Sequence, residues 1–112
     1  MQSVNHKIMC LFCQIINKET PGDFIYEDDE IVAFNDKFPK SKTHILIVPK
    51  KHIETINDLK EEESDEILVG KMFLVAKKIA KEKNLEGYKL QFNVGEKGGQ
   101  IIFHIHLHLI SN

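Results

Sequence analysis

The sequence is short of the features that mark several protein classes. It has no tryptophan and only two cysteines among 112 residues, which excludes a scaffold held by several disulfides. Its longest apolar runs, such as ILIV at 45–48, are far shorter than the roughly 20 residues that span a membrane. The N-terminal residues are polar and lack the apolar region of a signal peptide. We therefore expect a cytoplasmic protein.

The chain also lacks an excess of charge of either sign. Fifteen lysines and arginines face 17 aspartates and glutamates, for a formal net charge of −2. This balance gives no electrostatic footprint for nucleic-acid binding. Hydrophobic residues make up 42% of the chain, and no repeat, low-complexity run or linker divides it. We expect one soluble domain over residues 1–112, with one core.

The order of the predicted elements indicates an α+β fold with an antiparallel sheet. A short helix is predicted in QIINKETPG at 14–22, and two strands with an acidic turn in the segment 23–36. The nearly continuous apolar run THILIVP at 43–49 is typical of a central strand. Leu68, Met72, Val75 and Ile79 recur at helical spacing and predict a long helix over about 64–83.

Two further strands are predicted near the C-terminus. YKLQFNV at 88–94 and QIIFHIHLHLI at 100–110 flank the turn GEKGG, so the simplest arrangement is an antiparallel hairpin. The polar face of the first strand should adjoin the histidine face of the second, which places Asn93 near the histidines. With the three earlier strands, the sheet has five strands.

Three histidines alternate with apolar residues in HIHLHL. In a strand, His104, His106 and His108 share one face while Phe103, Ile105, Leu107 and Leu109 take the other. A solvated strand face is the simplest explanation, although other residue types would serve such a face equally well. The alternatives are a three-histidine zinc site and an imidazole nucleophile with supporting neighbours. Asn93 and the glycine-rich turn favour the nucleophile, because backbone amides at glycines can closely approach phosphate oxygens.

The two cysteines stand close together in CLFC, at positions 10 and 13. In a reducing compartment this spacing indicates a metal half-site or a redox pair before a structural disulfide. No thioredoxin-like βαβ pattern surrounds the pair, which favours metal ligation.

The histidine pattern resembles a known family. HIHLHLI matches the signature of the histidine triad (HIT) superfamily of nucleotide hydrolases and transferases. The segments FCQIINKETPGDFIYEDDEIVAFND, THILIVPKKHI and NVGEKGGQ are similar, in the same order, to segments of its Hint-like branch. The resemblance covers about residues 10–110 and implies the HIT-like fold, a five-stranded antiparallel sheet with one long and one short helix.

The resemblance also implies catalytic roles. His106 corresponds to the histidine that attacks the α-phosphate and forms a nucleotidyl-histidine, which water then hydrolyses. The carbonyl of His104 corresponds to the group that fixes the reactive tautomer. His108 and His44 match positions that contact the phosphate, and Asn93 matches an asparagine near the phosphate and leaving group.

Two binding sites follow from the same resemblance. Phe34 and Asp36 match the nucleoside pocket, in which the carboxylate accepts the ribose hydroxyls. The nucleotide-binding set also includes Asn93, Gly99, Gln100 and His108. Some bacterial relatives hold a structural zinc, and the four matching positions are Cys10, Cys13, His52 and His104. The alternative is a pair of reduced, semi-buried thiols, as in relatives that fold without metal.

The implied activity is hydrolysis of purine nucleoside phosphoramidates or related nucleotide conjugates by a homodimer that pairs through the long helix and the following strand. One alternative is a dinucleoside polyphosphate hydrolase, and another is a nucleotide-binding or scaffolding protein with little turnover. The motive for the last is Ile101, which replaces a serine that assists the leaving group in many relatives.

Overall fold

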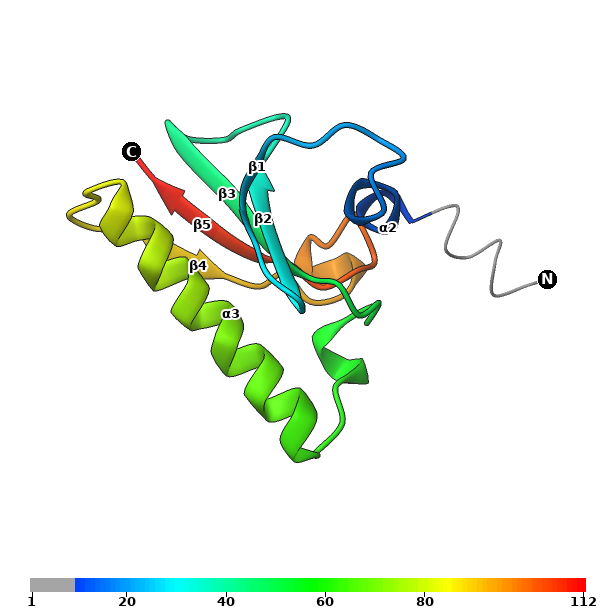
Figure 1. Cartoon of the computed structure of the whole chain (residues 1–112). Coiled ribbons are helices and arrows are strands. Elements are labelled where there is room, and N and C mark those ends of the chain that lie inside the picture. Colours follow the sequence, from blue (N-terminus) through cyan, green and yellow to red (C-terminus); the bar gives the residue numbers. More distant parts are fainter. Residues whose placement is uncertain (1–9) are drawn as a thin grey trace.

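The computed structural model describes residues 10–112, which form one five-stranded sheet with helices on both sides (Figure 1). The strands are β1 (Phe24–Glu27), β2 (Ile31–Asn35), β3 (Thr43–Pro49), β4 (Lys89–Gln91) and β5 (Leu107–Ser111). Their spatial order is β1-β2-β3-β5-β4, and every neighbouring pair is antiparallel. The predicted α+β class with a five-stranded antiparallel sheet is confirmed.

The sheet separates two apolar clusters. Alternate residues of β3 point to opposite faces, so Ile45 and Ile47 join the larger cluster with the helix α3 (Glu63–Glu82). Leu46 and Val48 join a smaller cluster with α2 (Leu11–Ile16) on the other face. Because β3 is covered on both sides, its run of apolar residues is explained, as predicted for a central strand.

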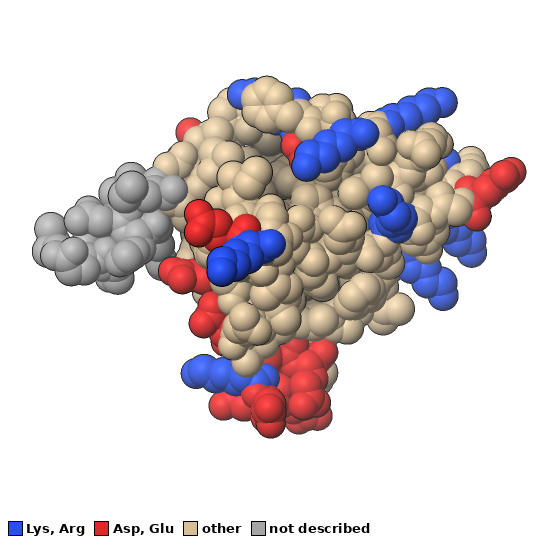
Figure 2. Space-filling view, turned by 180° about the vertical axis from the view of Figure 1, so that it is seen from behind, with Lys and Arg blue, Asp and Glu red and all other residues tan. Residues whose placement is uncertain are grey.

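The long helix matches its prediction to within one residue at each end. Leu68, Met72, Val75 and Ile79 are all buried against the sheet. Its first turn is acidic, and Figure 2 shows acidic side chains gathered at the end of the molecule where α3 begins. Negative charge at a helix N-terminus is favourable because it complements the helix dipole. Among residues 10–112, no helix combines the length and apolar character needed to cross a membrane.

The short helix lies earlier than predicted. It was expected in residues 14–22, whereas α2 covers Leu11–Ile16 and contains the second cysteine. Cys10 precedes the helix, and its Sγ accepts the backbone N–H of Cys13 at 3.4 Å. Lys18 takes a positive φ of 64°, which ends the helical geometry before the predicted stop signals at Thr20 and Pro21.

The two C-terminal strands pair as predicted but are shorter. Of the two predicted strands, only Lys89–Gln91 and Leu107–Ser111 pair in the sheet. The segment between them includes a short 3-10 helix, η2 (Glu96–Gly98). The chain bends over residues 102–104, and the backbone N–H of Ile105 bonds to the Ile53 carbonyl instead of a strand neighbour. Phe103 is therefore 41% exposed, against the prediction that it shares the apolar face. Ile105, Leu107 and Leu109 are buried as predicted.

Candidate active site and metal centre

The histidines gather on the sheet face opposite α3, beside α2. His108 lies in β5 and pairs in register with Leu46 of β3, a residue of the α2-side cluster. His44 lies two residues earlier on β3, so its side chain shares that face. The ring of His106, just before β5, lies 4.8 Å from that of His108 between centroids. Three histidines, from β3, from β5 and from the residue just before β5, thus meet at one place.

The hydrogen bonding of His106 leaves one ring nitrogen with a free lone pair. Its Nδ1 donates to the His104 carbonyl at 2.7 Å, which fixes the tautomer and leaves Nε2 unprotonated. The ring is only 9% exposed and packs edge-on against Phe12, 5.0 Å between centroids. Burial lowers the pKa of His106, although the His104 carbonyl and the Asp36 charge oppose the shift. A neutral, oriented imidazole is the form that can act as a nucleophile.

His44 and His108 form a second ordered pair. The backbone N–H of Lys40 donates to His44 Nδ1 at 3.1 Å, so neutral His44 carries its proton on Nε2. That nitrogen lies 2.9 Å from Nδ1 of His108, which then accepts, and the proton of His108 is on its Nε2. Burial, together with the neighbouring His106 and His44, lowers the pKa of His108 to about 4. His108 therefore presents an N–H donor without a net charge.

Asp36 faces this pair. Its Oδ2 lies 3.4 Å from Nε2 of His44, and its Oδ1 accepts the backbone N–H of Phe38 at 2.9 Å. The ligand atoms of Asp36, His44 and His108 all lie within 4.8 Å of one another. A metal ion here does not fit the hydrogen bonds, because His44 uses its Nδ1 lone pair for Lys40 and its Nε2 carries the proton. The three groups are better described as a hydrogen-bonding constellation.

Phe34 and Asp36, the two residues predicted for the nucleoside pocket, have different surroundings. Phe34 is buried at 3% exposure, with its ring centroid 5.5 Å from that of Phe12 and 6.0 Å from that of Phe24. It forms part of the apolar wall beneath the site. Asp36, two residues further along, is partly exposed and able to meet a ligand.

The glycine-rich segment is held by Gln100. This side chain is buried, and its Oε1 accepts the backbone N–H of Gly95 at 2.9 Å. Its Nε2 donates to the carbonyls of Glu54 at 2.7 Å and Ile102 at 3.1 Å. Since these bonds engage both ends of the amide, a nucleotide contact from Gln100 would come from its backbone. The positioning role of this side chain was not predicted.

Asn93 lies beside Gly99. Gly99 has a φ of 90°, and a Cβ there would meet the Asn93 amide nitrogen at 2.9 Å. Glycine is therefore required both by the backbone and by the close side chain. Asn93 Oδ1 accepts from Gln91, at 2.9 Å, and Gln91 pairs in register with His108. The amide thus sits just beyond the end of the β4–β5 ladder.

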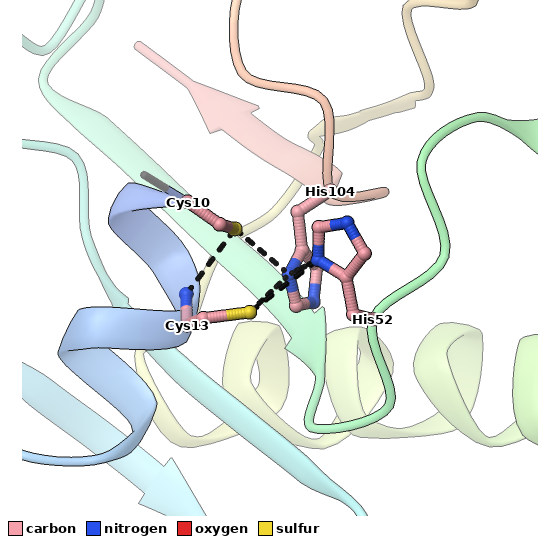
Figure 3. A group of neighbouring side chains, drawn as sticks. All are labelled: Cys10, Cys13, His52 and His104. Atoms are coloured by element: carbon pink, nitrogen blue, oxygen red, sulfur yellow. Dashed lines mark hydrogen bonds between the residues drawn. The ribbon is translucent and has the colours of Figure 1, made fainter. Parts of the chain in front are cut away.

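Cys10, Cys13, His52 and His104 converge from three separate segments (Figure 3). Nδ1 of His104 lies 3.4 Å from the Cys10 Sγ and 3.7 Å from the Cys13 Sγ. Nδ1 of His52 lies 3.3 Å from the Cys13 Sγ and 3.2 Å from Nδ1 of His104. Donor atoms in a tetrahedral zinc site, with bonds of about 2.0–2.3 Å, lie roughly 3.3–3.8 Å apart. The donor set fits such a site.

The surroundings of His104 also favour a role as a metal ligand. Its Nε2 donates to the Pro49 carbonyl at 2.7 Å, so the Nδ1 lone pair faces the thiols. Burial lowers the pKa of His104 to about 4 and keeps the ring neutral. The structure therefore brings all four predicted metal positions together, with His104 preset in the ligand tautomer.

Sequence reasoning missed two contributors besides Gln100. Phe12, which packs on the His106 ring, had only its place between the cysteines as a signal. The backbone N–H of Lys40 gives no sequence signal, because any residue except proline supplies one.

Comparison with known proteins gives a consistent result. The family profile described as "Scavenger mRNA decapping enzyme C-term binding" matches residues 9–112. The purine nucleoside phosphoramidase of Escherichia coli strain K12 is 43% identical over 102 residues, which cover 89% of this chain and 84% of that protein.

Comparison with solved structures gives the same family. A HIT family hydrolase from Legionella pneumophila is 47% identical, with a TM-score of 0.87 and 92% of both chains covered. A zinc-bound histidine triad family protein from Mycobacterium smegmatis is 30% identical, with a TM-score of 0.82, 95% of this chain covered and 76% of that one. These likenesses extend over nearly the whole chain and include the segment that carries the three alternating histidines. The chain belongs to the histidine triad family of hydrolases.

Proposed function

We propose that the chain, as a single domain over residues 1–112, hydrolyses purine nucleoside phosphoramidates or related nucleotide conjugates through a nucleotidyl-histidine on His106. The observation that carries this proposal is the 2.7 Å hydrogen bond from His106 Nδ1 to the His104 carbonyl, which leaves Nε2 ready to attack. The E. coli relative named purine nucleoside phosphoramidase supports the choice of substrate.

The reaction has two steps. His106 Nε2 attacks the α-phosphorus, the bond between phosphorus and the leaving nitrogen breaks, and the departing amine takes up a proton. Water then attacks the nucleotidyl-histidine and releases the nucleoside monophosphate and free His106. A covalent intermediate divides one difficult displacement into two easier ones.

The neighbouring groups have separate roles in this proposal. His108 donates its Nε2 proton to a phosphate oxygen, where charge develops in the transition state. His44 holds His108 in that tautomer through the 2.9 Å contact. Asn93 lies by the leaving group, and the backbone at Gly99 and Gln100 lies by the phosphate. Asp36, above the apolar wall that contains Phe34, accepts the ribose hydroxyls.

The direct test is release of AMP from adenosine 5′-phosphoramidate, with His106→Ala at the same protein concentration. We expect turnover by the parent chain and loss of at least about a thousandfold in the variant, because the covalent route is removed. Diadenosine tetraphosphate, tested in parallel, distinguishes a dinucleoside polyphosphate hydrolase. Equal inertness of both proteins toward both substrates, with AMP still bound, would contradict the proposal and favour a binding protein.

The low-turnover alternative has one specific observation in its favour. Ile101 is 84% exposed and offers no donor to a leaving group. Ile101→Ser restores the hydroxyl that many relatives carry at this position. A large gain in turnover by this variant would indicate that leaving-group protonation limits the parent chain.

We also propose that Cys10, Cys13, His52 and His104 hold a structural zinc ion, a closed site of two thiolates and two imidazoles. The zinc-bound relative from M. smegmatis supports this choice of metal. The ion would tie the N-terminal segment to the segment before β5, and its affinity would stabilise the fold.

Elemental analysis and thermal unfolding test this assignment. Cys13→Ser should lower both the zinc content and the melting temperature, because it removes one donor. Glu54→Gln is the matched control, since Glu54 lies in the cavity beside the cluster but outside the four donors. Retention of one zinc per chain by Cys13→Ser would refute the assignment.

The proposed setting is a cytoplasmic homodimer. Exposed aromatic side chains lie at one edge of the sheet: Phe73 of α3 is 40% exposed and its ring is 5.9 Å from that of Phe92, just after β4. Tyr88, just before β4, is 38% exposed. Since β4 is an edge strand, a second copy pairing there would cover these rings and extend the sheet.

A further inference from the structure

We propose that Cys10 and Cys13 are an oxidation site for hydroperoxides, and that His104 passes the state of these thiols to the nucleophile His106. The effect on turnover rests on the proposed function of His106 and on the proposed zinc ion. The oxidation itself does not, so the two parts can be tested separately.

The first observation is access. A cavity of about 260 Å³ opens beside the cluster and is lined by Cys10, Leu11, His52, Glu54, Ile101, Ile102 and Phe103. Cys10 is only partly buried, whereas Cys13 is 7% exposed. Because Cys10 lines the cavity and Cys13 does not, a small oxidant entering it meets Cys10 before Cys13. Two of the four donors, Cys10 and His52, border this opening, so the metal centre is also within reach of solvent.

The second observation is the proximity of the two sulfurs. Both Sγ atoms lie within 4.8 Å of each other and contact the same nitrogen, Nδ1 of His104. A disulfide requires approach to about 2.05 Å, which side-chain rotation at a two-residue spacing can supply. The N–H of Cys13, bonded to the Cys10 Sγ, holds the two residues at the start of the same helical turn.

The chemistry balances with the hydroperoxide as the two-electron oxidant. The Cys10 thiolate attacks one oxygen of hydrogen peroxide, the O–O bond breaks, and Cys10 becomes a sulfenic acid while hydroxide leaves. The Cys13 thiolate then attacks the sulfenic sulfur, the S–O bond breaks, and the oxygen leaves as a second hydroxide. One peroxide is reduced, two thiolates are oxidised to one disulfide, and the hydroxides take up protons to give two waters.

The third observation is the position of His104 between the two sites. Its side chain faces the thiols at 3.4 Å and 3.7 Å, and its carbonyl holds Nδ1 of His106 at 2.7 Å. The next residue, Ile105, bonds through its backbone to Ile53, the neighbour of His52. A disulfide removes two donors from the metal site, so the segments at 52–53 and 104–106 lose the tie through the metal and keep only their backbone hydrogen bond. The ring of His106 then loses its fixed orientation, and misplacement of about 1 Å is enough to cost roughly a hundredfold in rate.

The experiment treats the zinc-loaded full chain with hydrogen peroxide. We expect the intact mass to fall by two hydrogens, zinc to appear with a colorimetric chelator on the same time course, and turnover of adenosine 5′-phosphoramidate to fall about tenfold or more. Dithiothreitol with added zinc should restore all three. Disulfide formation and zinc loss without a change in turnover would refute the transmission through His104, and absence of the disulfide would refute the oxidation site.

Two controls separate this inference from the proposed function. His106→Ala should oxidise and release zinc like the parent chain, although it is inactive. In the parent chain, the NMR signal of the Nδ1 proton of His106 should be sharp when the thiols are reduced and lost on oxidation. This signal reports the contact to His104 even if the phosphoramidate proves not to be a substrate, and its persistence in the oxidised chain would contradict the proposal.

A matched pair of variants identifies the sulfur that reacts first. In Cys13→Ser only the Cys10 thiol remains, and in Cys10→Ser only the Cys13 thiol. We expect dimedone to trap sulfenic acid severalfold faster in Cys13→Ser. Equal or reversed rates would refute entry through the cavity.

Discussion

His104 serves two sites with different parts of the same residue. Its ring faces the thiols and its carbonyl accepts from His106. The alternation of HIHLHL predicted from the residues alone that the three rings lie close together. It did not assign the carbonyl, because a backbone acceptor is common to every residue; that role came only from the family resemblance.

His108 gives a prediction about pH. Burial and the neighbouring histidines lower its pKa from 6.5 to about 4, whereas the Asp36 charge raises it. Site-resolved NMR should therefore show His108 neutral at pH 6, and Asp36→Asn should lower its pKa further. An ordinary midpoint near 6.5 in the folded chain would contradict the burial argument.

The same shift has a consequence for stability. As pH falls from 6.5 toward 4, the unfolded chain takes up a proton at this histidine before the folded chain does. The contribution of His108 therefore lowers the free energy of unfolding across this window, and the loss is complete below about pH 4.

At the scale of elements, predictability follows the number of residues that share one pattern. The helix α3 has a buried stripe from Asp65 to Ala80, about four turns, so its limits were predicted to within one residue. The second C-terminal strand was predicted to begin at residue 100, whereas β5 begins at Leu107, because the apolar alternation of residues 103–106 continues without a ladder partner. His104, Ile105 and His106 are all buried without sheet pairing, whereas Phe103 is exposed, so burial in this segment does not follow the alternation.

The segment 95–102 gives a prediction at this scale. Gln100→Leu leaves the Gly95 N–H and the Glu54 and Ile102 carbonyls without this partner, so we expect a loss of about 2–4 kcal/mol in the free energy of unfolding. The exposed Gln91→Leu should cost no more than about 0.5 kcal/mol. Urea denaturation compares the two. Similar stability of both variants would show that the hydrogen bonds of the Gln100 side chain contribute little to the stability of the fold.

For the whole molecule, the strand order is the feature that composition and periodicity left open. The order β1-β2-β3-β5-β4 places β5 between β3 and β4, so His44 meets His108 across 64 positions of sequence. Alternation within a strand reveals which residues share a face but carries no information on which strands become neighbours. The family resemblance, not local pattern, predicted that His44 joins the site.

The proposed homodimer gives a prediction for the whole molecule. Phe73→Glu places a charge beside the β4 edge and should shift the chain toward monomer in analytical ultracentrifugation, because burying an unpaired carboxylate is costly. Lys78→Glu is the matched control, since Lys78 lies over the Tyr26 ring on the other side of α3. Circular dichroism checks that both variants fold. An unchanged dimer, or a parent chain that is already monomeric, would contradict this edge as the interface.

The separation of the metal donors also bears on how the protein is made. Cys10 and His104 are 94 positions apart, so during synthesis both thiols leave the ribosome long before their last partner exists. N-terminal segments begin to fold first in a growing chain, but the proposed zinc site would close only when residue 104 has been added. Once His52 has been added, a metal ion captured by the nascent chain would be held by three of its four proposed ligands until His104 follows.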